Sequence, residues 1–408
     1  MKDQCCVIVG ASHAGVSLAI QLRREGWVGK IKLISKESEL PYHRPPVSKD
    51  LLAGTKGIEQ IRLRPEKVYQ DNEIELLLGR TATGIDIGQE LIRVNDEDIK
   101  YEKLAICAGA RPRELVLGRE QEKIFYLRNY ADALAAATRI SEKQRVIIIG
   151  GGYIGLESAA VLQAKNVDVT VLEREERILQ RVTSEPMSKF MSKLHQDQGV
   201  SIRTGVQIES ISTVGGEKVV HCSDGKIFRA DFLIIGVGIL PNTEFISDSK
   251  IELQAGSIVV DKFGQTTCPH IYAAGDCTIH PSLIYGRMLK LESVQNANDQ
   301  ARVVAANICG KETIYDVVPW FWSDQYSIKL QMAGLGQGFD EIVVRGDMDA
   351  GLKSSFTLFY LREKILLGTD CVSRPKEFMV SKQLIKNRSV LDSSILADES
   401  VEPLNFLS

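Results

Sequence analysis

The amino-acid sequence predicts an α/β protein of two or three domains. Its 408 residues exceed what one hydrophobic core usually serves, and 44% apolar with 25% charged residues is ordinary for a globular chain. A strand–turn–helix–strand pattern with a glycine-rich turn occurs twice. Residues 319–408 show strand-like runs followed by one helical stretch, which favours a separate α+β domain.

The first copy of the pattern lies near the N-terminus. An apolar strand at 5–9 leads into a turn at 10–15, a helical pattern at 16–25 and a second strand at 30–35. The turn contains Gly10, Ser12, His13, Ala14 and Gly15. Serine replaces the second glycine of the usual pattern, so a Cβ is added where the backbone should approach a ligand.

The second copy is better formed. A strand at 145–149 leads into a turn at 150–155, a helix that runs to 164, and a strand at 167–172 that ends in Glu173. The turn contains Gly150, Gly152, Tyr153, Ile154 and Gly155. In such a turn the first glycine allows a tight turn, the second lets the backbone approach a pyrophosphate, and the third lets the helix pack closely on the strand.

Both copies therefore predict Rossmann-like dinucleotide-binding units, with the pyrophosphate at the N-terminus of the helix. In the second unit, Glu173 is placed to accept hydrogen bonds from adenosine ribose hydroxyls and to repel a 2′-phosphate. We therefore expect NADH rather than NADPH, although the adjacent Arg174 weakens the discrimination. A third segment, 266–276, reads as a strand ending in Gly275-Asp276, where the aspartate can bind a cofactor hydroxyl.

The order of these elements resembles the flavoproteins with glutathione-reductase-like architecture, in which an NAD domain is inserted into an FAD domain. Within that group the chain resembles the FAD-dependent NADH:ferredoxin and rubredoxin reductases of oxygenase systems, over nearly its whole length. The resemblance rests on six motifs: 41–49 (PYHRPPVSK), 126–128 (YLR), 150–157 (GGGYIGLE), 236–238 (GVG), 291–297 (LESVQNA) and 319–325 (PWFWSDQ).

The resemblance implies three domains and a catalytic pair. Residues 1–112 and 245–318 would form the FAD domain, 113–244 the NAD domain, and 319–408 a C-terminal α+β domain at the flavin face. Lys49 would lie beside flavin N5 and pair with Glu157 at the hydride-transfer site. Without the resemblance, a surface lysine and a surface glutamate would be the ordinary interpretation.

The resemblance also implies two sets of ligands. The FAD ligands would be Gly10, Ser12, His13, Ala14, Gly15, Lys36, Glu37, Lys49, Ala82, Arg128, Asp276, Val294 and Trp320. The NAD ligands would be Gly150, Gly152, Tyr153, Ile154, Gly155, Glu157, Glu173, Arg181, Gly236, Val237 and Gly238. Lys36 departs from the family, which usually carries an acidic ribose ligand there. Either Glu37 replaces it or Lys36 holds the pyrophosphate, and the sequence leaves both open.

The composition of the chain limits which classes of partner are expected. A net charge of -3 gives no global reason to expect nucleic acid or a membrane surface. The eight cysteines show no CxxC pair or metal-ligand spacing, which predicts reduced thiols and no metal. The first strand begins without an apolar leader and no apolar run approaches 18 residues, so we expect a cytoplasmic protein.

The absence of cysteine from 41–46 predicts the electron acceptor. Related disulfide reductases, peroxidases and oxidases use a thiol near the flavin, so without one we expect electrons to leave singly to a protein. The resemblance points to a [2Fe–2S] ferredoxin, or second a rubredoxin, that serves a ring-hydroxylating dioxygenase of aromatic hydrocarbon catabolism or a cytochrome P450. Two alternatives are a thiol-free NADH oxidase or diaphorase, and a flavin-binding module like the apoptosis-inducing flavoproteins.

Overall fold

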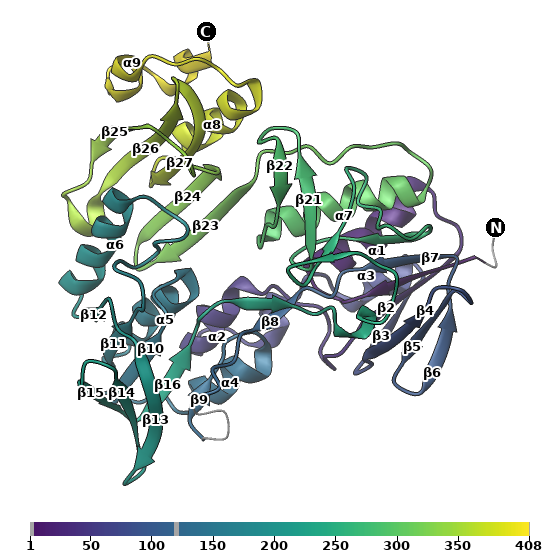
Figure 1. Cartoon of the computed structure of the whole chain (residues 1–408), viewed down its shortest axis with the longest axis horizontal. Helices are drawn as coiled ribbons and strands as arrows, with labels where there is room; N and C mark the ends of the chain where they lie inside the picture. The colour runs from purple at the N-terminus through teal and green to yellow at the C-terminus, as the bar shows by residue number, and fades with distance from the viewer. Residues whose placement is uncertain (1–3, 118–121, 408) are drawn as a thin grey trace. The chain divides into compact units, whose positions relative to one another are not determined.

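A computed structural model describes residues 4–117 and 122–407, and the chain divides into two compact units (Figure 1). The first unit contains Met1–Arg44, Ile58–Arg111 and Ile239–Pro319. The second contains Pro45–Gly57, Pro112–Gly238 and Trp320–Ser408. The predicted FAD domain shares most of its residues with the first unit, but Pro45–Gly57 belongs to the second. The boundaries between three domains stay a prediction.

A parallel five-stranded sheet organises the first unit, in the order β20-β7-β1-β2-β3. Its strands are β1 (Cys5–Val9), β2 (Lys30–Ser35), β3 (Ile74–Leu78), β7 (Lys103–Ile106) and β20 (Ile271–Ala273). Val9 lies opposite Ile34 on one side and Ile106 on the other, so the carboxyl ends of the three central strands meet at one edge. That edge carries the residues that follow each strand, among them the first glycine turn.

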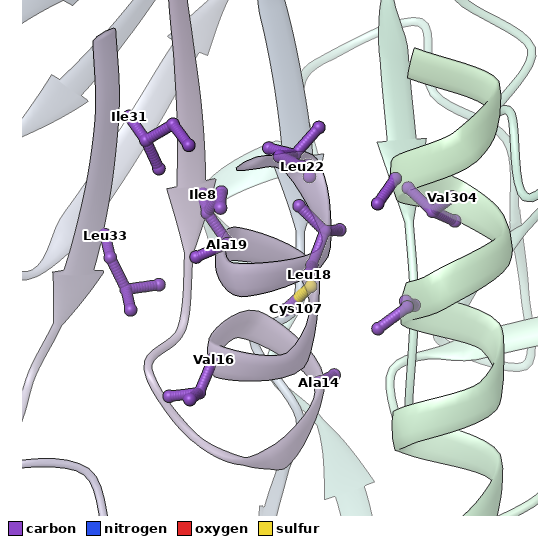
Figure 2. Close-up of a cluster of buried hydrophobic side chains, with 14 of the residues drawn as sticks. Ile8, Ala14, Val16, Leu18, Ala19, Leu22, Ile31, Leu33, Cys107 and Val304 are labelled. Atoms are coloured by element: carbon purple, nitrogen blue, oxygen red, sulfur yellow. The ribbon is translucent and has the colours of Figure 1, made fainter. Parts of the chain in front are cut away.

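Helix α1 (His13–Glu25) packs between this sheet and helix α7 (Val294–Ile308), as Figure 2 shows. Apolar residues recur on one face of α1 at helical spacing, and Leu18 and Leu22 are fully buried there. They join Ile8 and Leu33 from the strands and Val304 from α7 in one core. The core fixes α1 against β1 and so fixes the turn that joins them.

The first unit also contains smaller elements. They are α3 (Glu66–Asp71), the antiparallel strands β4 (Ala82–Asp86), β5 (Leu91–Val94) and β6 (Glu97–Lys100), and the sheet of β18 (Leu253–Gln254), β19 (Ser257–Val259), β21 (Thr278–Ser282) and β22 (Arg287–Leu289). Short strands β8 (Ala110–Pro112) and β17 (Ile239–Pro241) lie where the chain passes between the units. None of the described helices is long and apolar enough to cross a membrane.

The second unit repeats the parallel arrangement, in the order β12-β11-β10-β16-β9. Its strands are β9 (Ile124–Phe125), β10 (Arg145–Ile149), β11 (Asp168–Leu172), β12 (Ser201–Arg203) and β16 (Phe232–Ile235). Its helices are α2 (Asp50–Ala53), α4 (Tyr130–Ala137), α5 (Tyr153–Gln163) and α6 (Glu185–Asp197). An antiparallel hairpin sheet adds β13 (Ile208–Val214), β14 (Glu217–Cys222) and β15 (Ile227–Ala230).

The rest of the second unit is an antiparallel sheet with helices, as predicted for the C-terminal segment. Its elements are β23 (Trp320–Gln325), β24 (Ile328–Gly334), β25 (Glu341–Asp347), β26 (Ser355–Arg362), β27 (Ile365–Val372), α8 (Pro375–Asn387) and α9 (Ser393–Ala397). Strand β27 contains Gly368 and continues to Val372.

We expect Leu18→Ala to destabilise the first unit by about 2–5 kcal/mol, because the substitution leaves a cavity between the sheet and α7. Urea unfolding followed by far-UV circular dichroism measures the change. Leu283→Ala is the matched control, since Leu283 in the same unit is 60% exposed. Equal losses in the two variants would contradict the packing described here.

Candidate active site

The first glycine turn is shaped by close contacts of the backbone. Gly10 has a φ of 106°, and a Cβ on it would lie 2.1 Å from the carbonyl oxygen of Cys107. A Cβ on Gly15 would lie 1.8 Å from the carbonyl oxygen of Gly10. Only glycine allows this approach of strand and helix, so β1 delivers the chain directly into the N-terminus of α1.

The N-terminus of α1 lies directly after the first glycine turn. Ser12 is the N-cap residue, yet its side chain caps no backbone N–H of the described helix and instead accepts a hydrogen bond from Arg44 Nε at 3.3 Å. The dipole of a helix favours an anion at its N-terminus, so this end of α1 fits a pyrophosphate. His13 lies beside His43, with 3.3 Å between Nε2 and Nδ1.

The structure gives different surroundings to Lys36 and Glu37. Lys36 is exposed, whereas the Glu37 carboxylate accepts hydrogen bonds from the Arg44 guanidinium and the Tyr42 hydroxyl. Arg44 also donates to the Tyr42 hydroxyl at 2.7 Å and to Ser12 in the glycine turn. Glu37, through Arg44, is therefore connected to the first glycine turn. The residue that binds the adenosine ribose stays a prediction.

Other predicted FAD ligands lie in the first unit at the ends of elements. Asp276 is half-buried after β20, next to Gly275, whose N–H donates to Gln300 Oε1 at 2.8 Å. Val294 is the first residue of α7, and Ser293 caps that helix by accepting from Asn296 N at 3.1 Å. Ala82 begins β4. Polar side chains and a helix N-terminus are thus available, which fits a flavin nucleotide.

The second glycine turn repeats the geometry of the first. Gly150 has a φ of 109°, and its Cβ would lie 2.3 Å from the carbonyl oxygen of Gly236. A Cβ on Gly155 would lie 2.2 Å from the carbonyl oxygen of Gly150. Gly152 is the N-cap of α5 and has no described atom within 4 Å of its ideal Cβ position. The space beside Gly152 and the open helix end fit a dinucleotide pyrophosphate.

Glu173 holds the second turn from the end of β11. Its Oε2 accepts a hydrogen bond from Gly151 N at 2.6 Å, and its Oε1 accepts one from Glu175 N at 2.9 Å. A carboxylate oxygen has two lone pairs, so each can accept another hydrogen bond from a ribose hydroxyl. Arg174 points away and pairs with Glu175 at 2.8 Å with its side chain 78% exposed, and Arg181 is exposed.

The remaining predicted NAD residues differ in position and exposure. Gly236, Val237 and Gly238 follow β16, and Gly236 N donates to Ile149 O at 2.8 Å. Ile154 is 44% exposed. Tyr153 instead extends to the C-terminal sheet, with its hydroxyl 2.8 Å from Met332 Sδ. Its side chain therefore joins the two parts of the second unit.

Three predicted FAD ligands belong to the second unit, namely Arg128, Trp320 and Lys49, the last of which is described below with Glu157. Arg128 is half-buried, and its backbone N–H donates to Asp132 Oδ2 at 3.0 Å at the start of α4. The Trp320 ring lies 5.6 Å from the Trp322 ring and 5.7 Å from the Phe378 ring, with Lys382 Nζ 5.8 Å from its centre. The alternation of β23 puts the two tryptophans on one face of the strand.

The structure brings Lys49 and Glu157 together. Lys49 Nζ lies 3.0 Å from Glu157 Oε1, although 108 positions separate the two residues. Glu157 is 6% exposed on α5, while Lys49 precedes α2 with its side chain 19% exposed. Asp324 is a second, more exposed carboxylate, 3.9 Å from Lys49. The ammonium group is thus held in one place by a buried anion.

Two hydroxyl groups complete the surroundings of Glu157. Ser48 donates to Oε2 at 2.8 Å and Ser323 donates to Oε1 at 2.7 Å. Burial raises the pKa of Glu157, and the charge of Lys49 and these hydrogen bonds oppose that rise. Sequence reasoning missed both serines as site residues. Both lie inside motifs that carry the resemblance, 41–49 and 319–325, and that was the available indication.

The chain matches two protein families. Residues 5–301 match pyridine nucleotide-disulphide oxidoreductases, and residues 320–405 match the family described as reductase C-terminal. The chain is 40% identical to putidaredoxin reductase of Pseudomonas putida over 403 residues, which cover 97% of this chain and 94% of the relative. It is 35% identical to rubredoxin-NAD(+) reductase of Pseudomonas putida over 374 residues, covering 91% and 96%.

A solved structure agrees with these sequence matches. The crystal structure of the covalent putidaredoxin reductase–putidaredoxin complex has a TM-score of 0.95 and 38% identity, covering 100% of this chain and 99% of that chain. Together with the two parallel sheets, this likeness confirms the predicted fold class: two Rossmann-like units and a C-terminal α+β segment.

We expect Gly152→Ala and Gly155→Ala to fail in different ways. Gly152→Ala should keep the melting temperature but weaken NADH binding about tenfold, since the new methyl group occupies the open space at the helix end. Gly155→Ala should lower the melting temperature, because its Cβ meets the Gly150 carbonyl oxygen. Thermal unfolding and NADH titration separate the two. Unchanged NADH affinity in Gly152→Ala would contradict the assignment of the site.

Proposed function

This chain belongs to the pyridine nucleotide-disulphide oxidoreductase family, and on that premise we propose that it is an FAD-containing NADH:ferredoxin reductase. The observation that carries the proposal is the ion pair at 3.0 Å between Lys49 and the buried Glu157, in the motifs that carry the resemblance. When bound, FAD accepts a hydride from the nicotinamide and gives electrons up one at a time. The chain's own residues bind, orient and adjust charge.

The proposed role of Lys49 is to hold a fixed positive charge at the hydride-transfer site. The Glu157 carboxylate neutralises that charge and prevents the lysine from swinging into solvent, because the two lie 3.0 Å apart and Glu157 is buried. Ser48 and Ser323 keep the carboxylate oriented. The pair positions the nicotinamide and does not itself accept the hydride.

The proposed electron donor is NADH. The Glu173 carboxylate, held by Gly151 N at 2.6 Å, would repel a 2′-phosphate on the adenosine ribose. Arg174 is turned toward Glu175 and so offers that phosphate little attraction.

The proposed acceptor is a [2Fe–2S] ferredoxin, or second a rubredoxin, that serves an oxygenase. Its support is the similarity to a putidaredoxin reductase and to a rubredoxin-NAD(+) reductase. The pair of tryptophans on β23 beside Lys382 offers an aromatic and basic face for an acidic partner. We propose that the protein works in the cytoplasm, where its eight free thiols would remain reduced.

Anaerobic stopped-flow mixing tests the proposal. The purified flavin-loaded protein should be reduced faster by NADH than by NADPH, and should then reduce one member of a panel of ferredoxins and rubredoxins in a saturable, salt-sensitive reaction. Oxygen without protein acceptor is the control. Rapid re-oxidation by oxygen that no acceptor accelerates would favour an NADH oxidase, and no reduction by NADH would favour a flavin-binding module.

We expect Glu173→Gln to raise the ratio of kcat/KM for NADPH over NADH about tenfold. The amide keeps an oxygen acceptor for Gly151 N but removes the charge that opposes a 2′-phosphate. Glu176→Gln is the matched control, because Glu176 is exposed in the same segment. If the ratio rises equally in both variants, the preference does not come from Glu173.

A further inference from the structure

A chain of hydrogen bonds, most of them buried, continues from Glu157 into the C-terminal sheet and helix α6. Ser323 donates to Glu157 Oε1 at 2.7 Å, and Gln325 Nε2 donates to Ser323 Oγ at 3.0 Å. Gln325 Oε1 lies 2.7 Å from His195 Nε2, and His195 Nδ1 lies 3.1 Å from the Tyr326 hydroxyl. We refer to these five residues as the buried array.

While Glu157 is ionised, the hydrogen bonds of the buried array can all be formed only if every donor points toward the Glu157 end of the array. The carbonyl oxygen of Gln325 faces His195 Nε2, so that nitrogen must carry the proton. In a neutral imidazole, Nδ1 is then an acceptor, and the Tyr326 hydroxyl donates to it. The Gln325 amide donates to Ser323, whose own proton goes to the carboxylate.

The reverse direction requires a protonated Glu157. If Gln325 were rotated by 180°, its oxygen would accept the Ser323 proton, and Ser323 Oγ would then face Glu157 Oε1 without a proton between them. A proton on Glu157 would repair that contact. Ser323, Gln325 and His195 are 1%, 2% and 0% exposed, so bulk solvent does not reach these contacts, and a missing donor there is costly. The direction of the array and the charge of Glu157 are therefore coupled.

We propose, on the basis of the proposed function, that Ser323, Gln325 and His195 are positioning residues that keep Glu157 ionised and aimed at Lys49. Strand β23 makes this possible because Ser323 and Gln325 project from the same side of the strand, while Asp324 between them is exposed. Helix α6 contributes His195 from the nucleotide-binding part of the unit. The C-terminal segment thus acts on the hydride-transfer site through hydrogen bonds.

The other charged and titratable groups around Glu157 agree with this arrangement. Lys49, before α2, favours the ionised carboxylate, and Asp324 on β23 acts on Lys49 from 3.9 Å. Burial raises the pKa of Tyr153 on α5 well above its usual value, so Tyr153 is neutral. Burial lowers the pKa of His195, which keeps its ring neutral as the direction of the array requires.

The first test measures the proton position on His195 directly. In the flavin-loaded protein with 15N-labelled histidine, we expect the Nε2–H tautomer between pH 6 and 8, with the resonance assigned by its loss in His195→Gln. Ser323→Ala should shift the ring toward a mixture of tautomers, since Gln325 loses its acceptor. Ser381→Ala, the same change at a serine buried outside the array, should leave the tautomer unchanged. An Nδ1–H tautomer in the unsubstituted protein would overturn the proposal.

The second test uses the pH dependence of flavin reduction by NADH. Loss of the Ser323 donor raises the pKa of Glu157, so the fall in rate toward low pH should begin about one pH unit higher in Ser323→Ala. Ser323→Thr, which keeps the hydroxyl, should restore the profile, and Ser381→Ala should not move it. Profiles that coincide in all variants would contradict the role given to the array.

The proposed reductase function and the proposed role of the buried array can be overturned independently of each other. The tautomer of His195 does not depend on any acceptor protein, so it tests the array even if no ferredoxin is reduced. Conversely, transfer to a ferredoxin with an Nδ1–H tautomer would support the proposed function and overturn the array.

Discussion

The buried carboxylate of Glu157 is the constraint on which the arrangement of the second unit depends. Breaking a buried ion pair by removing one partner typically costs roughly 3–5 kcal/mol, because the remaining charge is left without compensation. The chain supplies Lys49 and Ser48 from one segment, Glu157 from α5 and Ser323 from β23. Three distant parts of the sequence must therefore meet at one carboxylate, and each is held there by a polar contact.

The two glycine turns share one backbone geometry. In each, a glycine with φ near +106° or +109° stands beneath a carbonyl oxygen of the neighbouring strand connection, and the last glycine touches the first. What differs is the side chain that steadies the turn. Arg44 reaches Ser12 in the first turn, whereas Glu173 reaches Gly151 in the second. The same backbone therefore has a cation beside it in the first turn and an anion beside it in the second.

The fold, and part of the candidate site, could be predicted from the sequence. Apolar runs such as 5–9 and 145–149 predicted strands, and the glycine spacing that follows each run predicted the turn into a helix. Lys49 and Glu157 were found through motifs. Ser323, Gln325 and His195 were not, since no periodicity indicates which polar side chain on a half-buried strand will turn inward. Their role appears only when β23 and α6 are placed beside α5. Likewise, the sequence showed that Lys36 stands where the family usually has an acidic residue, but it did not predict the contact between Arg44 and Glu37.

The division of the chain into units has a consequence for synthesis on the ribosome. Neither unit is continuous: the sequence leaves the first unit at Arg44, returns at Ile58, leaves again at Arg111, returns at Ile239 and leaves at Pro319. Strand β20 and helix α7 complete the first sheet and core, so this unit stays unfinished until about three-quarters of the chain has been translated. The second unit waits still longer for β23. Nascent chains must therefore keep two incomplete cores soluble at once, which makes early chaperone engagement and slow late assembly expected features of its biogenesis.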